Sequence, residues 1–202
     1  MIWLTSPDAT APALPAAWLI ATGKQPANLQ ERSELRRGTA KRLVAQQFGL
    51  EPGSVKLDHD ERGRPLLAQP AGTGLHLSLA TRGGLVAVAL AHGPVGIDVE
   101  RIDLATEPPL AMLHPQEREA LLALPESARP LAFAQLWSAK EAYVKALGTG
   151  FLRAPESFAV RLLSTERFEV ADPEAPGLAT GASRIIENGG QGNLAAAIVV
   201  LA

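Results

Sequence analysis

The chain has 202 residues, of which 47% are hydrophobic and 20% charged, so it is long enough to bury a substantial core. Its net charge of -2 and its pI near 6.1 give no overall field that would hold nucleic acid or an anionic membrane, so neither partner is expected. The chain contains no cysteine, which excludes a disulfide framework, a thiolate nucleophile and a cysteine-ligated zinc site.

The first residues give no sign of export or membrane insertion. They lack the basic opening and the apolar run of a secretory signal, and no apolar stretch of the sequence is as long as a membrane span. We therefore expect a cytoplasmic protein.

The first quarter of the chain predicts a connection followed by a helix. Residues 7–26 are rich in alanine, proline and threonine, which favours an irregular segment with at most one helical turn. Residues 29–48 combine spaced leucines with arginine and lysine, and Gly49 follows as a C-cap. This pattern predicts an amphipathic helix with a basic face.

The rest of the chain alternates between strand-like and helical patterns. Strand-like runs separated by glycine-containing turns predict a meandering antiparallel sheet, with strands at residues 55–57, 75–79, 85–91 and 95–99. Helical patterns follow at residues 108–124 and 127–147, the second closed by Gly148, and His114-Pro115 is typical of a helix start. The tail returns to strands, at residues 158–163, 167–170, 184–187 and 194–201.

This order of elements predicts an α+β fold of two similarly built lobes, each an antiparallel sheet packed with a long helix. We expect the lobes to comprise residues 1–100 and 101–202. No sequence identity is visible between the halves, so the expected duplication depends on topology alone. A chain with two lobes can be complete as a monomer, which is the state we expect.

Two carboxylates stand close together on the strand expected at residues 95–99. In the run Gly96-Ile97-Asp98-Val99-Glu100, alternation places Asp98 and Glu100 on one face while Ile97 and Val99 face the core. Carboxylates one strand repeat apart repel each other, so a divalent cation or a nearby cationic side chain is the simplest way to keep both ionised. The alternative is a solvated edge strand on which acids discourage aggregation.

A second cluster lies on the helix expected at residues 127–147. Trp137, Glu141 and Lys145 follow at intervals of four residues and therefore share a helix face. If this face meets the Asp98/Glu100 strand, three carboxylates and a lysine converge on an oxygen-rich magnesium site. The alternative is an ordinary Glu141–Lys145 helix pair, worth about 0.2–0.5 kcal/mol.

Together the two stretches resemble the signatures of the 4'-phosphopantetheinyl transferase superfamily, Gly-Ile-Asp-Val-Glu followed by Trp-Ser-x-Lys-Glu-x-x-x-Lys. The resemblance extends upstream, since Gly63-Arg64-Pro65 resembles the family's Gly-Lys-Pro turn and Leu75-His76-Leu77-Ser78 resembles a strand leading to its Ser-His pair. It covers residues 32–151, with the two-lobed layout of the single-chain, Sfp-type branch. The family fold implies two lobes related by a pseudo-twofold axis, with the active site at their interface.

The resemblance implies an enzyme that transfers the 4'-phosphopantetheine group of coenzyme A to a serine hydroxyl of an acyl, polyketide or peptidyl carrier protein. The reaction is magnesium-dependent and releases 3',5'-ADP. By similarity, Asp98, Glu100 and Glu141 hold the metal ion, and Lys145 assists electrostatically at the phosphate. Glu141, or a water that it orients, is the expected base, so Glu141 and Lys145 are the candidate catalytic residues.

Several residues are candidates for binding coenzyme A, because guanidinium groups match phosphate oxygens and the family's anion-binding positions fall nearby. Arg32 and Arg64 lead this set, and Lys41 on the same basic helix is a further candidate. The full set is Arg32, Arg37, Arg64, Pro65, Ser78, Asp98 and Lys145. For each basic residue the alternative is a solvated helix face.

One departure from the family pattern concerns a histidine that contacts coenzyme A phosphates. Leu79 stands at that position, and leucine cannot donate a hydrogen bond. His76 is expected on the same strand face as Ser78 and is a possible substitute. A non-catalytic relative that binds coenzyme A or a carrier protein without transfer is therefore an alternative, as is an unrelated magnesium-dependent phosphohydrolase. The sequence leaves open the carrier, its pathway, and the choice between Mg²⁺ and Mn²⁺.

Overall fold

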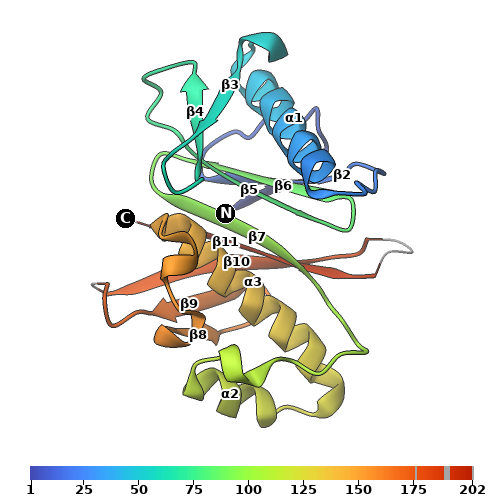
Figure 1. Ribbon diagram of the computed structural model, residues 1–202, viewed down its shortest axis with the longest axis vertical. Helices are drawn as coiled ribbons and strands as arrows, with labels where there is room; N and C mark the ends of the chain where they lie inside the picture. Colours follow the sequence, from blue (N-terminus) through green and yellow to red (C-terminus); the bar gives the residue numbers. More distant parts are fainter. Residues whose placement is uncertain (176, 189–191, 202) are drawn as a thin grey trace.

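The computed structural model describes residues 1–175, 177–188 and 192–201. It has the α+β architecture expected from the sequence, with two sheets and a small hairpin covered by a few helices (Figure 1). Within the described residues, no helix is long and apolar enough to cross a membrane.

The first sheet is packed against helix α1 (Leu29–Phe48), which begins at the side-chain cap of Asn28 and ends at Gly49 in the left-handed conformation. Leu43 and Val44 of this helix are buried against the sheet. The sheet has four strands in the order β1 (Ile2–Leu4), β2 (Ala16–Ala21), β6 (Leu85–Ala91) and β5 (His76–Arg82). A separate hairpin beside it is formed by β3 (Lys56–His59) and β4 (Pro65–Gln69).

The irregular connection expected at residues 7–26 is wrong for residues 16–21, which form β2, and is observed on either side of that strand. This strand pairs with β1 on one side and β6 on the other, and its first five residues are buried. A strand covered on both faces is a continuous apolar run without alternation. The alanines of β2 are small residues buried in the middle of the sheet. Composition alone did not distinguish this alanine-containing strand from an irregular segment.

The second sheet has five strands, in the order β7 (Val95–Arg101), β11 (Leu194–Val200), β10 (Leu178–Ile186), β9 (Arg167–Ala171) and β8 (Ala159–Leu162). β7 runs diagonally across the middle of the molecule (Figure 1). It pairs along its whole length with β11. The meander expected across residues 55–99 is therefore wrong for its last strand, and also for its first, since β3 pairs with β4 in the separate hairpin. The lobe boundary expected at residue 100 falls within β7, near its last residue.

The helical pattern expected at residues 108–124 divides into a 3-10 turn, Leu110–Met112, and helix α2, Pro115–Leu122. The break occurs because Pro115 occupies the first turn and His114 is the N-cap, as its position before proline predicted. The helix expected at residues 127–147 is observed as α3, Arg129–Leu147, with Gly148 as its left-handed C-cap.

Helix α3 packs directly on β7 at Gly96. A methyl group built at this glycine would lie 1.8 Å from the carbonyl oxygen of Ala142 and 2.6 Å from the amide nitrogen of Ala146. The helix backbone therefore occupies the space that any side chain at position 96 would need. This close approach sets the distance between the two stretches that the sequence singled out.

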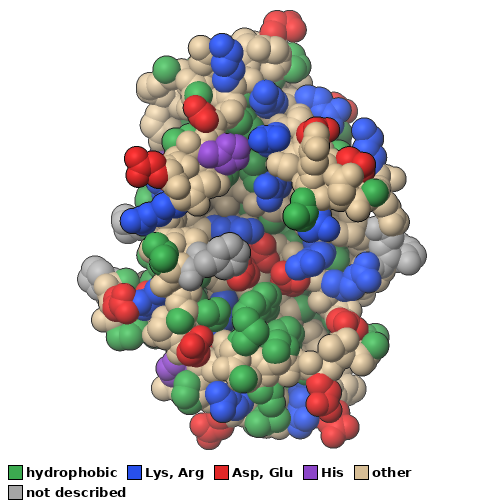
Figure 2. Space-filling view, in the orientation of Figure 1, with side chains coloured by type: hydrophobic (Ala, Val, Ile, Leu, Met, Phe, Trp, Pro, Cys, Tyr) green, Lys and Arg blue, Asp and Glu red, His purple; other side chains and the backbone are tan. Residues whose placement is uncertain are grey.

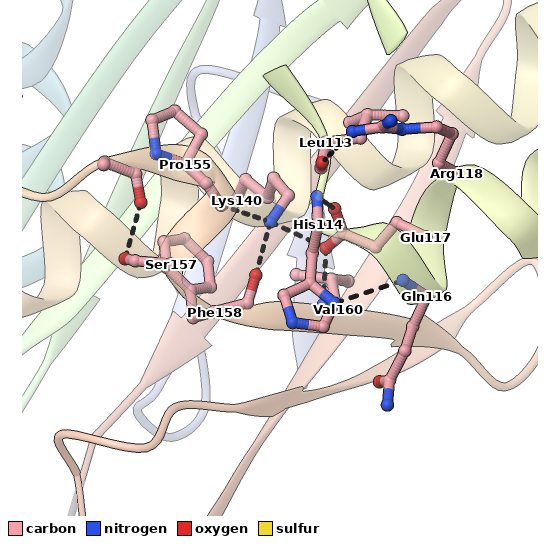
Figure 3. Close-up of polar contacts among 11 residues, drawn as sticks. Leu113, His114, Gln116, Glu117, Arg118, Lys140, Pro155, Ser157, Phe158 and Val160 are labelled. Atoms are coloured by element: carbon pink, nitrogen blue, oxygen red, sulfur yellow. Dashed lines mark hydrogen bonds and ion pairs between the residues drawn. The ribbon is translucent and has the colours of Figure 1, made fainter. Parts of the chain in front are cut away.

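A buried ion pair fixes α3 against α2 and the second sheet. Lys140 Nζ lies 2.6 Å from Glu117 Oε1, and both side chains are almost completely buried. Figure 3 shows Lys140 also donating to the carbonyl oxygens of Pro155 and Phe158, at 2.7 and 2.8 Å. Glu117 Oε1 accepts a hydrogen bond from the amide of Val160. Burial lowers the pKa of Lys140, and the neighbouring carboxylate of Glu117 acts in the opposite direction.

We expect Gly96→Ala to destabilise the protein by about 1–3 kcal/mol, because α3 must move away from β7. Urea denaturation measures the change. The matched control is Gly38→Ala in the middle of α1, where an added methyl group meets nothing within 4 Å. That change should stabilise the fold by roughly 0.5–1 kcal/mol. Equal stability of the Gly96→Ala variant and the wild type would contradict the close packing.

We expect Lys140→Met to destabilise the fold by about 3–5 kcal/mol, since it leaves the Glu117 carboxylate buried without its cation. Adding Glu117→Gln to this variant should recover part of the loss, and a double-mutant cycle in urea measures the coupling. Additive effects of the two changes would show that Lys140 and Glu117 do not interact in solution.

Candidate functional site

The alternation predicted for β7 is observed. Ile97 and Val99 are buried between the two sheets, where they pack with residues of β6 and β11. Asp98 lies on the opposite face, which is the face that α3 covers, and only 7% of its surface is exposed. Its Oδ1 atom lies 2.6 Å from Lys145 Nζ, and Lys145 also donates to the carbonyl oxygen of Ile97 at 3.1 Å. The structure thus brings the two sequence stretches into direct contact.

The second oxygen of Asp98 has a different environment. Asp98 Oδ2 is buried and has no hydrogen-bond partner among the described residues. A buried carboxylate oxygen without a donor is costly, because the desolvation of the oxygen is not compensated. The position therefore suits a ligand that donates a hydrogen bond or carries positive charge.

Glu100 is bound by an arginine from the neighbouring strand. The guanidinium of Arg82, at the end of β5, lies 2.5 and 2.6 Å from the two carboxylate oxygens. Burial raises the pKa of Glu100, the charge of Asp98 raises it further, and Arg82 acts against both. The repulsion between the two carboxylates of β7 is thus present in the fold, as the sequence predicted.

Glu141 lies on α3 one turn before Lys145 and faces the same acidic group. Burial raises the pKa of Glu141, as do the charges of Asp98 and Glu100, whereas Lys145 lowers it. Among the described residues, none of the ion pairs includes Glu141. Its carboxylate is therefore available to a cation or a proton.

Beside this acidic group lies a cleft of about 560 Å³. Its walls come from α1, the β3–β4 hairpin, β5, α3 and the segment after α3, so both halves of the chain form it. Figure 2 shows basic side chains surrounding a group of acidic side chains near the middle of the molecule. A cleft with several basic side chains in its walls, next to carboxylates, suits a phosphorylated ligand that is bound together with a metal ion.

The structure brings most of the proposed coenzyme A residues to this cleft but not all of them. The expected residues that line it are Arg37, Arg64, Pro65, Ser78, Glu141 and Lys145. Arg32 and Lys41 are not among its lining residues. Arg32 is exposed one helical turn before Arg36, outside the cleft wall, so its role in binding coenzyme A stays a prediction. His76 does not line the cleft either, whereas Leu79 does.

Two of the lining residues also have structural partners. Ser78 Oγ accepts a hydrogen bond from the amide of Ile97 at 3.0 Å and so holds β7 beside β5. Arg64 Nε lies 3.2 Å from Asp60 Oδ2. A methyl group at Gly148 would lie 2.9 Å from an Arg64 guanidinium nitrogen, so this arginine rests on the C-cap of α3.

Sequence reasoning missed several basic residues of the cleft. Arg36, Arg62, Lys140 and Arg153 line it, although none was assigned to the site. For Arg36 the signal was its place beside Arg37 on a helix already expected to have a basic face. Arg153 pairs with Asp172 and Glu174, which are distant in sequence, and no local pattern indicates this.

The carboxylates fit a small hard cation in their chemistry, because Mg²⁺ prefers oxygen ligands and Asp98 has an unpaired buried oxygen. Within the described residues, however, no three potential ligands are already grouped as a metal site. Glu100 is held by Arg82 and Asp98 by Lys145, so side-chain movement must precede coordination by all three carboxylates.

Comparison with known proteins points to one family. The family model for the 4'-phosphopantetheinyl transferase superfamily matches residues 94–199, which include β7 and α3. Similar curated proteins include the 4'-phosphopantetheinyl transferase HetI of Nostoc sp. (strain PCC 7120), 34% identical over 136 residues that make up 64% of this chain and 56% of the relative.

Two relatives from Bacillus subtilis are also similar. One, a 4'-phosphopantetheinyl transferase, is 29% identical over 136 residues, which are 65% of this chain and 58% of the relative. The other, the transferase Sfp of strain 168, is 26% identical over 134 residues, which are 66% of this chain and 59% of the relative. The chain thus spans less than two thirds of the length of these relatives. The match over residues 94–199, which holds the Asp98–Lys145 contact, shows that the chain belongs to the 4'-phosphopantetheinyl transferase superfamily.

Proposed function

We propose that this protein transfers the 4'-phosphopantetheine group of coenzyme A to a serine hydroxyl of a carrier protein and releases 3',5'-ADP. The observation that carries the proposal is the contact between Asp98 of β7 and Lys145 of α3, with Glu141 beside them at the edge of a basic cleft. The transferases HetI and Sfp, which are similar to this chain, support the same reaction.

We assign the metal ligands of this reaction to Asp98, Glu100 and Glu141. The unpaired oxygen of Asp98 and the free carboxylate of Glu141 support the assignment. A bound Mg²⁺ would neutralise charge on the pyrophosphate of coenzyme A and on the departing 3',5'-ADP. Mn²⁺ has similar ligand preferences, so the identity of the metal stays open.

The serine hydroxyl of the carrier must lose its proton as its oxygen bonds to the phosphorus that bears pantetheine. Glu141, or a water that it orients, accepts this proton, because its carboxylate lines the cleft beside Lys145. The bond between that phosphorus and the oxygen of 3',5'-ADP breaks in the same reaction. The contact with Asp98 fixes the position of the Lys145 ammonium group, and from that position Lys145 stabilises the negative charge of the phosphate.

The wall that α1 contributes supplies cations for the remaining phosphate groups of coenzyme A. Arg36 and Arg37 line the cleft, and within the described residues neither forms an ion pair. Burial lowers the pKa of Arg36, and the charges of Arg37 and Arg32 lower it further. These like charges repel one another, and an anion between them relieves the repulsion.

A second candidate is a relative that binds coenzyme A or a carrier protein without transfer. Leu79 favours it, because this buried apolar side chain lines the cleft at the position where the motif resemblance implies a phosphate-binding histidine. The acceptor, the cytoplasmic location and the monomeric state stay predictions, as does the division into lobes of residues 1–100 and 101–202.

The transferase reaction is tested by the intact mass of several apo carrier proteins incubated with the protein, coenzyme A and Mg²⁺. We expect one phosphopantetheine group to be added, and Glu141→Gln should reduce the rate by about 10²–10⁴-fold because the proton acceptor is lost. Glu169→Gln, which changes an exposed ion pair with Arg161, is the matched control. Calorimetric binding of coenzyme A without any mass change in the carriers would favour the non-catalytic alternative.

Arg36→Gln and Arg37→Gln should each raise the KM for coenzyme A by roughly 10- to 100-fold, as expected for the loss of a charged hydrogen bond worth about 1.5–3 kcal/mol. Arg32→Gln, one turn earlier on the same helix, should have a smaller effect because Arg32 does not line the cleft. If Arg32→Gln raised the KM for coenzyme A more than Arg36→Gln did, Arg32, which the sequence indicated, would be the phosphate-binding residue in place of Arg36, which lines the cleft.

A further inference from the structure

Arg82 is a basic residue of the site that neither the motifs nor the cleft includes. It ends β5, just before the glycines of the β5–β6 turn, and its guanidinium binds both oxygens of Glu100. Glu100 is its only side-chain partner in the part of the chain that the structure describes. The residue that pairs with Arg82 is therefore itself a proposed metal ligand.

The two cations that neutralise the acidic group differ in how they are held. Lys145 binds Asp98 and is also anchored by the carbonyl oxygen of Ile97. Among the described residues Arg82 has no comparable backbone contact, and 44% of its side chain is exposed against 32% for Lys145. Arg82 is thus the cation that can move into solvent at the lower cost.

The contact also limits what Glu100 can do. Because the Nη2 atom of Arg82 lies between the two carboxylate oxygens, Glu100 cannot approach a divalent ion in the same direction unless Arg82 leaves. A divalent ion next to Asp98 and Glu141 would in turn repel the Arg82 charge. Arg82 and a metal ion therefore compete for one carboxylate.

We propose that Arg82 is an exchangeable internal counter-ion of the metal site, which occupies Glu100 until a divalent cation displaces it. This inference rests on the proposed function, because that function assigns Glu100 to the metal. On displacement, the guanidinium of Arg82 moves away from β7 into solvent, while the backbone of Arg82 stays at the end of β5. Arg82 is a positioning residue in this scheme, since it acts through Glu100 and does not touch the substrate.

The test is direct titration of the full chain with Mn²⁺, followed by the paramagnetic resonance signal of the free ion. Arg82→Gln should bind Mn²⁺ about two- to fivefold more tightly than the wild type, because the competing ion pair is removed. Arg82→Lys keeps the competing charge and should stay closer to the wild type. Arg161→Gln, which removes the exposed pair with Glu169, is the matched control and should leave the affinity unchanged.

The outcomes separate this inference from the proposed function. If Glu141→Gln abolishes Mn²⁺ binding while Arg82→Gln leaves it unchanged or weakens it, the metal site stands and the counter-ion role is overturned. If the wild type and all Arg82 variants fail to bind Mn²⁺, the metal site itself is overturned, and the counter-ion role with it. Circular dichroism of each variant shows that the fold is retained.

Discussion

The close packing of α3 on β7 at Gly96 is the constraint on which the site depends. The helix backbone lies where a side chain at this position would be, so β7 and α3 approach more closely than two elements with ordinary side chains could. One strand repeat further along β7, Asp98 then reaches Lys145 of the helix. Asp98 and Lys145, which are distant in the sequence, can meet because Gly96 has no side chain to hold α3 away from β7.

This packing concentrates charge at a partly buried place. Asp98, Glu100 and Glu141 face one another, and their burial and mutual repulsion raise the pKa values of both glutamates. Lys145, which pairs with Asp98, and Arg82, which pairs with Glu100, offset part of the repulsion. The site thus stores an unfavourable interaction that a divalent cation would relieve, and such perturbed groups beside a cleft are typical of functional sites.

The acidic group lies beside the basic cleft, and the buried Lys140–Glu117 pair fixes the helix that contributes Glu141. Lys140 precedes Glu141 on α3 and also lines the cleft, but its ammonium group binds Glu117 and two backbone carbonyl groups. Adjacent residues of one motif therefore have separate tasks. Lys140 fixes the helix and the chain segment that follows it, and Glu141 is left free to face the cleft.

Local patterns of the sequence were sufficient for the long helices, the alternation on β7 and the two charged stretches, because each depends on residues a few positions apart. They were insufficient where distant segments decide the outcome. The buried strand β2 looked like a loop because only its partners in the sheet explain its alanines, and β7 pairs with β11, almost a hundred residues later. Helical periodicity could not show that the cleft ends before Arg32 and includes Arg36.

The most direct measurement of the central claim is the anomalous diffraction of Mn²⁺ in crystals of the protein grown with coenzyme A. The account predicts one strong peak between β7 and α3, coordinated by oxygen atoms of Asp98, Glu100 and Glu141 and by the pyrophosphate. A peak bound by other residues, or coenzyme A bound in the cleft with no metal beside Asp98, would contradict it.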